Sequence, residues 1–66
     1  MKMKYPNITV KLVGTDGNAF ATLGKVSKEM KKAGINQSEI DDFYDEATSG
    51  DYDHLLGTVM KWVDVA

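Results

Sequence analysis

The chain has 66 residues, no cysteine and no apolar run near the roughly 18 residues that a membrane helix needs, which excludes disulfides, thiolate zinc sites and membrane-spanning helices. This length gives one domain, residues 1–66, that buries only roughly 60% of its unfolded surface and is marginally stable alone. The net charge of −2 and the absence of arginine make nucleic-acid binding the least favoured function, because contacts to phosphates and bases favour the planar guanidinium group.

A short strand is predicted near the start of the chain. Ile8, Val10 and Leu12 alternate with polar residues, which is typical of a half-buried strand, and Pro6 suits the first positions of a strand. A single strand leaves its backbone hydrogen-bonding groups unpaired. It must therefore pair with the C-terminal WVDV segment or with the same strand of a second copy. The small size of the chain also favours a homodimer.

The turn after this strand is a candidate anion site. The segment GTDGNAF joins a strand to a helix through a glycine-containing turn, where free backbone N–H groups attract anions. The phosphate-loop, dinucleotide-binding and EF-hand patterns all fail in detail, so the favoured interpretation is that Asp16 or Asn18 caps the next helix while Gly17 turns the chain. The alternative is a small nucleotide-like ligand bound at Thr15, Asp16, Gly17 and Asn18; no cofactor is predicted.

The first predicted helix follows this turn. Apolar residues recur from Ala19 to Ala33 at spacings of three and four, with Phe20 beside them. Gly34 supplies the left-handed cap that ends the helix. Gly24 inside this helix and Gly57 inside the third indicate close approach of another backbone, within the monomer or across a dimer, because glycine in a helix interior costs about 1 kcal/mol relative to alanine.

The second predicted helix is acidic. It begins at the capping-box pair Asn36 and Glu39 and is closed by Gly50. One side is apolar, and the other side carries Asp41, Asp42, Asp45 and Glu46. Such a run is most often a solubilising surface, and the sharper interpretation is a face that binds a basic partner protein. Catalysis by a carboxylate pair needs a cleft, which the sequence does not indicate.

The segment TSGDYDHLL, residues 48–56, holds the only histidine, His54. Asp51 or Ser49 is expected to cap the third helix, with Asp53 in its first turn near the positive end of the helix dipole. A metal site or a Ser49–Asp51–His54 relay is the alternative. Residues 51 and 53 of a helix point about 200° apart, so the cap is favoured and neither a metal ligand nor a catalytic residue is assigned.

The third predicted helix runs to the segment KWVDVA. Val63 and Val65 fit either the end of this helix or a short second strand. Trp62 lies beside the apolar stripe of the helix. It either fills the small core from the side or forms an exposed apolar patch that binds a partner, as tryptophan often does at interface hot spots.

Charge is divided along the chain. Residues 1–33 hold seven lysines against two acids, a net charge of +5, and residues 34–66 hold one lysine against eight acids, a net charge of −7. Such a bipolar chain can pair its own halves, or it can meet another copy or a charged partner.

The segments GTDGNAF, ATSGDYDHLL and KWVDV together resemble a group of very small uncharacterised proteins found in bacteria and their phages. The resemblance spans nearly the whole chain, implies a bacterial or phage cytoplasmic setting and carries over no catalytic residue. The basic start, MKMKYPN, lacks the apolar core of a signal peptide and agrees with that setting.

The sequence therefore predicts an α+β domain of one strand followed by three helices. The predicted function is non-enzymatic: a protein-interaction module, encoded by a phage or another mobile element, that regulates or inhibits a host protein. Its expected binding residues are Asp41, Asp42, Asp45, Glu46 and Trp62.

Overall fold

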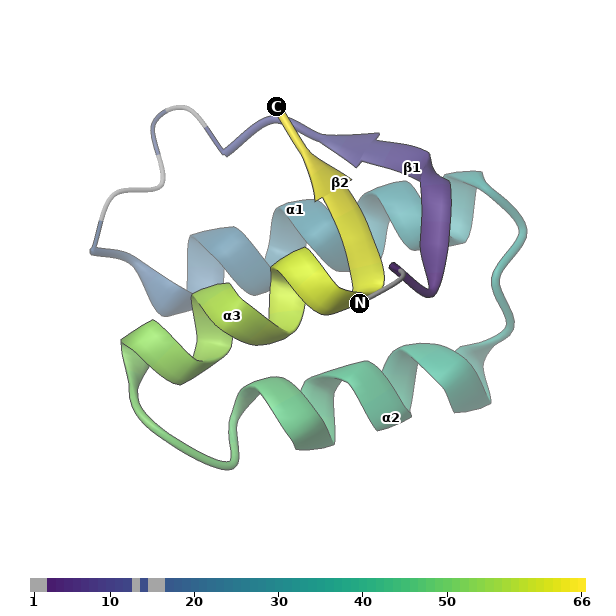
Figure 1. Ribbon diagram of the computed structural model, residues 1–66. Coiled ribbons are helices and arrows are strands. Elements are labelled where there is room, and N and C mark those ends of the chain that lie inside the picture. Colours follow the sequence, from purple (N-terminus) through teal and green to yellow (C-terminus); the bar gives the residue numbers. More distant parts are fainter. Residues whose placement is uncertain (1–2, 13, 15–16) are drawn as a thin grey trace.

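The computed structural model describes residues 3–12, 14 and 17–66. Its elements are β1 (Tyr5–Val10), α1 (Ala19–Lys32), α2 (Gln37–Ala47), α3 (Tyr52–Trp62) and β2 (Val63–Val65). This order confirms the predicted α+β fold and shows that the tail forms a second strand. The helices gather on one side of the two-stranded sheet (Figure 1). No helix in the described ranges is long and apolar enough to cross a membrane.

The sheet joins two segments from opposite ends of the sequence. β1 and β2 are parallel, and the register pairs Tyr5 with Val63, Thr9 with Asp64 and Val10 with Val65. The pairing is irregular between Tyr5 and Thr9, a stretch that includes Pro6, which has no N–H to donate. Parallel strands need a crossover connection, which all three helices supply here. The predicted strand thus pairs with the tail of its own chain, and its pairing gives no separate argument for a dimer.

Each helix begins at a polar cap. The cap residues are Asn18, Asn36 and Asp51. In each, a side-chain oxygen accepts a hydrogen bond from the backbone N–H of the residue three positions later, at 3.0, 2.9 and 2.9 Å respectively. At the end of α1, Gly34 has a φ of 85°, and the N–H of Ile35 donates to the carbonyl of Met30 at 3.0 Å. This is the left-handed helix ending that the sequence predicted.

The core draws on all five elements. The fully or nearly fully buried hydrophobic side chains are Ile8, Val10, Leu23, Val26, Met30, Ile40, Phe43, Ala47, Leu55, Val59, Trp62 and Val63. The predicted stripe of α1 is buried from Leu23 to Met30, whereas Ala33 lies beyond the helix and is exposed. Phe20, which lies beside the stripe, is exposed as well. The core therefore begins one turn into α1.

No other backbone of the same chain approaches Gly24 or Gly57 closely, so the predicted close approach within the monomer is wrong. A Cβ atom added at either position would meet no atom within 4 Å in the described structure, apart from its own helix backbone and chain neighbours. Gly24 lies on the exposed side of α1, where no other backbone approaches. The intramolecular packing reason for a glycine is thus absent at both positions.

Candidate functional site

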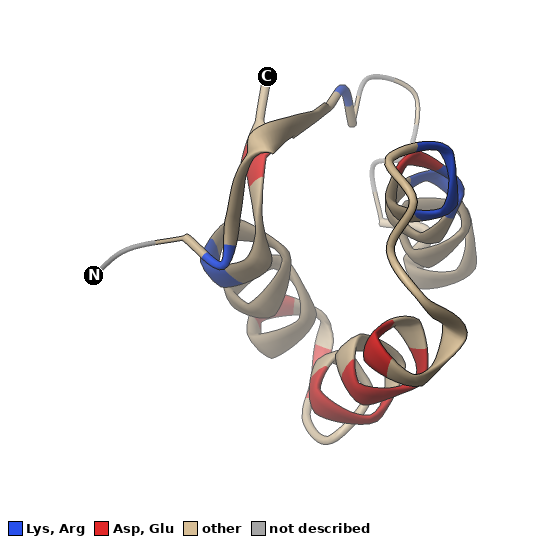
Figure 2. Cartoon of the chain, turned by 90° about the vertical axis from the view of Figure 1, so that its right-hand side faces the viewer, with Lys and Arg blue, Asp and Glu red and all other residues tan. Residues whose placement is uncertain are grey.

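The acidic surface of this protein, defined here as Asp41, Asp42 and Asp45, lies on the exposed side of α2. α2 turns Ile40 and Phe43 into the core, so the residues between them face solvent. Figure 2 shows the acids along α2 and the lysines of α1 on a separate part of the molecule. Asp41 accepts a hydrogen bond from the Gln37 side chain at 2.9 Å. The side chains of Asp42 and Asp45 make no hydrogen bond or ion pair with any residue that the structure describes.

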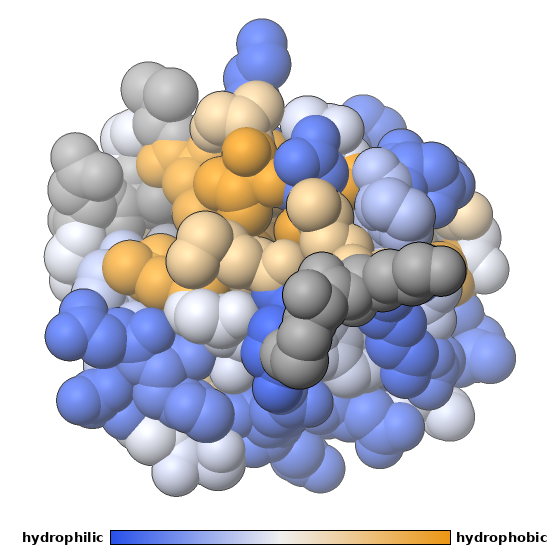
Figure 3. Space-filling view, in the orientation of Figure 1, coloured by the Kyte–Doolittle hydropathy of each residue, from blue (hydrophilic) through white to orange (hydrophobic). Residues whose placement is uncertain are grey.

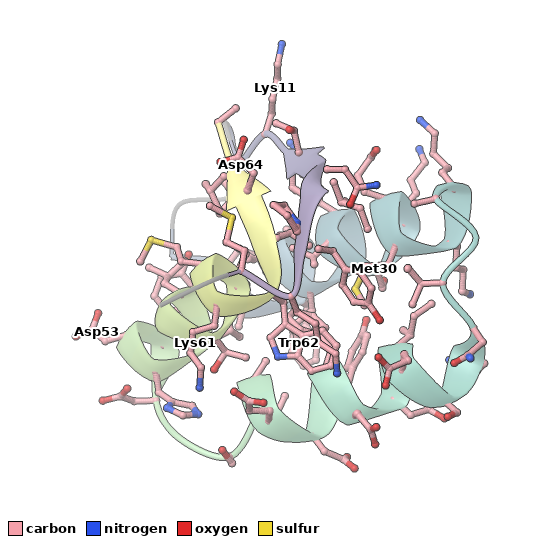
Figure 4. The ribbon with its side chains drawn as sticks, turned by 45° about the vertical axis from the view of Figure 1, so that its right-hand side comes forward. Lys11, Met30, Asp53, Lys61, Trp62 and Asp64 are labelled. Atoms are coloured by element: carbon pink, nitrogen blue, oxygen red, sulfur yellow. The ribbon has the colours of Figure 1, made fainter. Side chains whose placement is uncertain are left out.

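Glu46 is placed differently from the other acids of α2. Its carboxylate lies 3.0 Å from Lys61 Nζ and accepts a hydrogen bond from Trp62 Nε1 at 3.3 Å. The hydrogen bond from Lys61 is the main reason that the pKa of Glu46 is lowered from its usual 4.5. Figure 4 shows Lys61 and Trp62 above α2, where this contact forms. Glu46 therefore ties α2 to α3, although the sequence grouped it with the binding residues.

Trp62 is a core residue. Its side chain is 5% exposed, and its ring lies 5.6 Å from the ring of Phe43 in an edge-to-face arrangement. Lys4 Nζ lies 4.3 Å from the centroid of the same ring, which is cation–π geometry. The last turn of α3 sits between β1 and α2, so a residue beside the helix stripe is still covered. Of the two interpretations of Trp62, filling the core is correct, and an exposed patch around it is wrong.

A second linkage, which the sequence did not reveal, joins β1 to α2. The Tyr5 hydroxyl donates a hydrogen bond to Glu39 Oε1 at 2.5 Å, and Lys4 Nζ lies 3.0 Å from the same oxygen. The hydrogen bond lowers the pKa of Glu39, with Lys4 adding to the effect, and raises the pKa of Tyr5. Capping-box spacing assigned Glu39 to its own helix terminus. No local pattern in the sequence indicates a contact 34 residues away.

We expect stability to fall at both ends of the pH range. Glu39 and Glu46 have lower pKa values when folded, so their contribution is full above the unfolded value near 4.5 and is lost as the pH falls through the folded values. Tyr5 has a raised pKa when folded, so its contribution is full below 10.0 and is lost as the pH rises through the folded value. Thermal melting against pH measures both limbs. The variant Glu39→Gln should weaken both, and melting curves that match wild type across the whole range would contradict this account.

Two of the four residues of the predicted anion site lie outside the described residues. Nothing is described for Thr15 and Asp16, while Gly17 has a φ of 70° and Asn18 caps α1 through its side chain. Asn18 Oδ1 accepts a hydrogen bond from the N–H of Ala21, as the cap interpretation expected. A ligand at residues 15–18 stays a prediction.

The segment around His54 joins two helices. His54 Nε2 lies 2.8 Å from the Glu46 carbonyl oxygen and 3.0 Å from Ser49 Oγ. A carbonyl oxygen only accepts, so these contacts assign the hydrogen to Nε2, which then cannot take a proton from Ser49. Asp51 is occupied with the cap of α3. The described residues contain no cluster of three or more potential ligands that could hold a metal ion. Helix capping accounts for this geometry, as the favoured interpretation expected.

The chain was compared with models of protein families, with curated proteins and with solved structures. No family model, curated protein or solved structure matches it.

Proposed function

We propose that this chain is a non-enzymatic protein-interaction module that binds a basic surface of a partner protein through its acidic surface. The observation that supports this proposal is the pair Asp42 and Asp45, which stays exposed and unpaired among the described residues. Other acids of the same half have structural tasks: Glu39 and Glu46 link elements, Asp51 caps α3, and Asp64 accepts a hydrogen bond from Thr9 at 3.3 Å.

The position of the acidic surface is unfavourable for the helix itself. Like charges three or four residues apart repel, which applies to Asp45 with both Asp41 and Asp42. Asp45 also lies near the end of α2, where the helix dipole favours cations, and the last turn of α2 contains no basic residue. Glu46 offsets the same cost through Lys61. A basic partner would relieve the cost that Asp45 leaves within the chain.

The charge separation supports recognition by steering. The positive and negative halves meet at the ion pair Lys4–Glu39, whereas the ion pair Lys61–Glu46 lies within the negative half. The α1 lysines and the acidic surface lie apart (Figure 2). A surface of one sign speeds encounter with a partner of the opposite sign and makes binding sensitive to salt. The resemblance to small bacterial and phage proteins suggests that the chain acts in the bacterial cytoplasm, as a regulator or inhibitor of a host protein. Its small size favours a homodimer.

Charge reversal tests the acidic surface. We expect Asp42→Lys and Asp45→Lys each to reduce retention of a host protein captured from bacterial lysate by about tenfold at moderate salt, because attraction becomes repulsion. Quantitative mass spectrometry of the captured protein gives the measurement. Asp53→Lys is the matched control, since it reverses one exposed acid on α3 and should leave retention unchanged. If all three variants retained the host protein as well as wild type does, the acidic surface would not be the binding surface.

A further inference from the structure

Phe20 is unusual among the aromatic residues of this chain. Its side chain is 88% exposed, whereas Phe43 is fully buried and Trp62 nearly so. The other large hydrophobic residues described as exposed, Met3 and Met60, are less so, at 37% and 58%. An aromatic ring in water forfeits the burial that makes aromatic residues the main anchors of protein interfaces. Phe20 is therefore suited to be an interface anchor, but its ring is not buried within its own chain.

A pocket of matching size lies beside it. An open cavity of about 210 Å³ is formed by the first turns of α1, the end of α2 and the start of α3, which come together at one end of the molecule (Figure 1). Its apolar lining includes Leu23, Ala47, Tyr52 and Leu55, together with Phe20 itself. Apolar cavities of about 150 Å³ bind benzene, so this one has room for the ring of a phenylalanine.

We propose that the chain forms a two-fold symmetric dimer in which Phe20 of each copy enters the pocket of the other. Anchor and pocket are neighbours on one surface, so a two-fold axis between two copies satisfies both contacts at once and leaves neither open for further addition. A different protein could satisfy both contacts only if it supplied an aromatic anchor and a pocket of its own in the same arrangement. A second copy of this chain already carries both the anchor and the pocket.

The charges around the pocket permit this contact. Asp51 is the one charged residue in the described lining, and its carboxylate is engaged in the cap of α3. The lysines of α1 do not line the pocket, and neither does any residue of the acidic surface. Hydrophilic residues cover the molecule over α2, as the lower half of Figure 3 shows. The acidic surface therefore stays free in the dimer. The inference rests on the homodimer in the proposed function and is independent of the acidic surface.

Sedimentation velocity of the full chain over a wide concentration range tests the dimer. We expect wild type to approach twice the 7.3 kDa of one chain as concentration rises. Phe20→Ala should weaken dimerisation at least about 30-fold, the effect of losing a hot-spot residue, with an unchanged circular-dichroism spectrum because Phe20 is outside the core. Met60→Ala is the matched control: it removes another exposed side chain, away from the pocket, and should dimerise like wild type.

A mixed sample of isotope-labelled and unlabelled chains shows where the ring goes. We expect intermolecular nuclear Overhauser effects between the Phe20 ring and the methyl groups of Leu23 and Leu55. A monomer at every concentration, a dimer that survives Phe20→Ala, or contacts of the ring only with its own pocket would each overturn the proposal. Charge reversal at Asp42 should not affect dimerisation, so failure of this proposal is distinguishable from failure of the acidic surface.

Discussion

Replacing Trp62 with alanine should lower the free energy of unfolding by about 3–5 kcal/mol, a large part of the total stability of the chain. The side chain packs against Phe43, holds Lys4 over its ring and donates a hydrogen bond to Glu46, so the change removes contacts with β1 and α2 together. Truncation of a buried tryptophan costs about 3–5 kcal/mol. A chain of 66 residues has a total stability of about 3–10 kcal/mol, at 0.05–0.15 kcal/mol per residue. Urea denaturation followed by circular dichroism measures the loss.

Two further variants separate the contributions of Trp62. Trp62→Phe keeps an aromatic ring in the core but removes the Nε1–H, so we expect a smaller loss that includes about 1 kcal/mol for the hydrogen bond to Glu46. Met60→Ala changes an exposed residue of the same helix and should alter stability little. A denaturation midpoint for Trp62→Ala equal to that of Met60→Ala would show that Trp62 is not a core residue.

Val10→Asp is expected to abolish folding near neutral pH. Val10 is 1% exposed, contributes to the core from β1 and pairs with Val65. An ionised carboxylate placed there loses its hydration, and none of the described core residues is a cation. Lys25 and Lys28 line an open cavity with Val10, but both are exposed. The penalty exceeds several kcal/mol, which is comparable to the whole stability of a chain of this size. Circular dichroism and the dispersion of amide proton shifts report the outcome.

The matched control is Asn7→Asp, which introduces the same side chain three residues earlier, where β1 is exposed. This variant should fold like wild type. The comparison tests the alternation of buried and exposed residues along β1. A folded Val10→Asp variant with wild-type melting would mean that β1 does not bury this position.

Local patterns were sufficient for most of the fold. The caps at Asn18, Asn36 and Asp51 and the helix ending at Gly34 each depend on residues within a few positions of one another, and the structure confirms all four. The second strand was one of two alternatives, because Val63 and Val65 satisfy both a helical and an alternating pattern. Only the pairing with β1 distinguishes them, and that contact is distant in sequence.

The surface was harder to predict, because the periodicity of a helix separates its buried face from its exposed face but does not show how that helix packs against others. Asp42 and Asp45 were placed correctly on the exposed side of α2. Glu46 and Trp62 belong to a contact between two helices, which depends on how those helices pack together. The same limit applies to Tyr5 and Glu39, which meet across 34 residues. Whether the acidic surface binds a partner stays a prediction.

The parallel pairing of β1 and β2 has a consequence for the order of folding. Thr9 and Asp64 are 55 residues apart, so β1 is synthesised first and has no strand to join until residues 63–65 have been made. Closing so long a loop costs entropy before the contact stabilises anything. A nascent chain can therefore form helical turns early but cannot complete its sheet or bury Val63. We therefore expect this domain to complete its folding only after nearly all of its residues have been synthesised. Until then, the incomplete chain is accessible to cellular proteases.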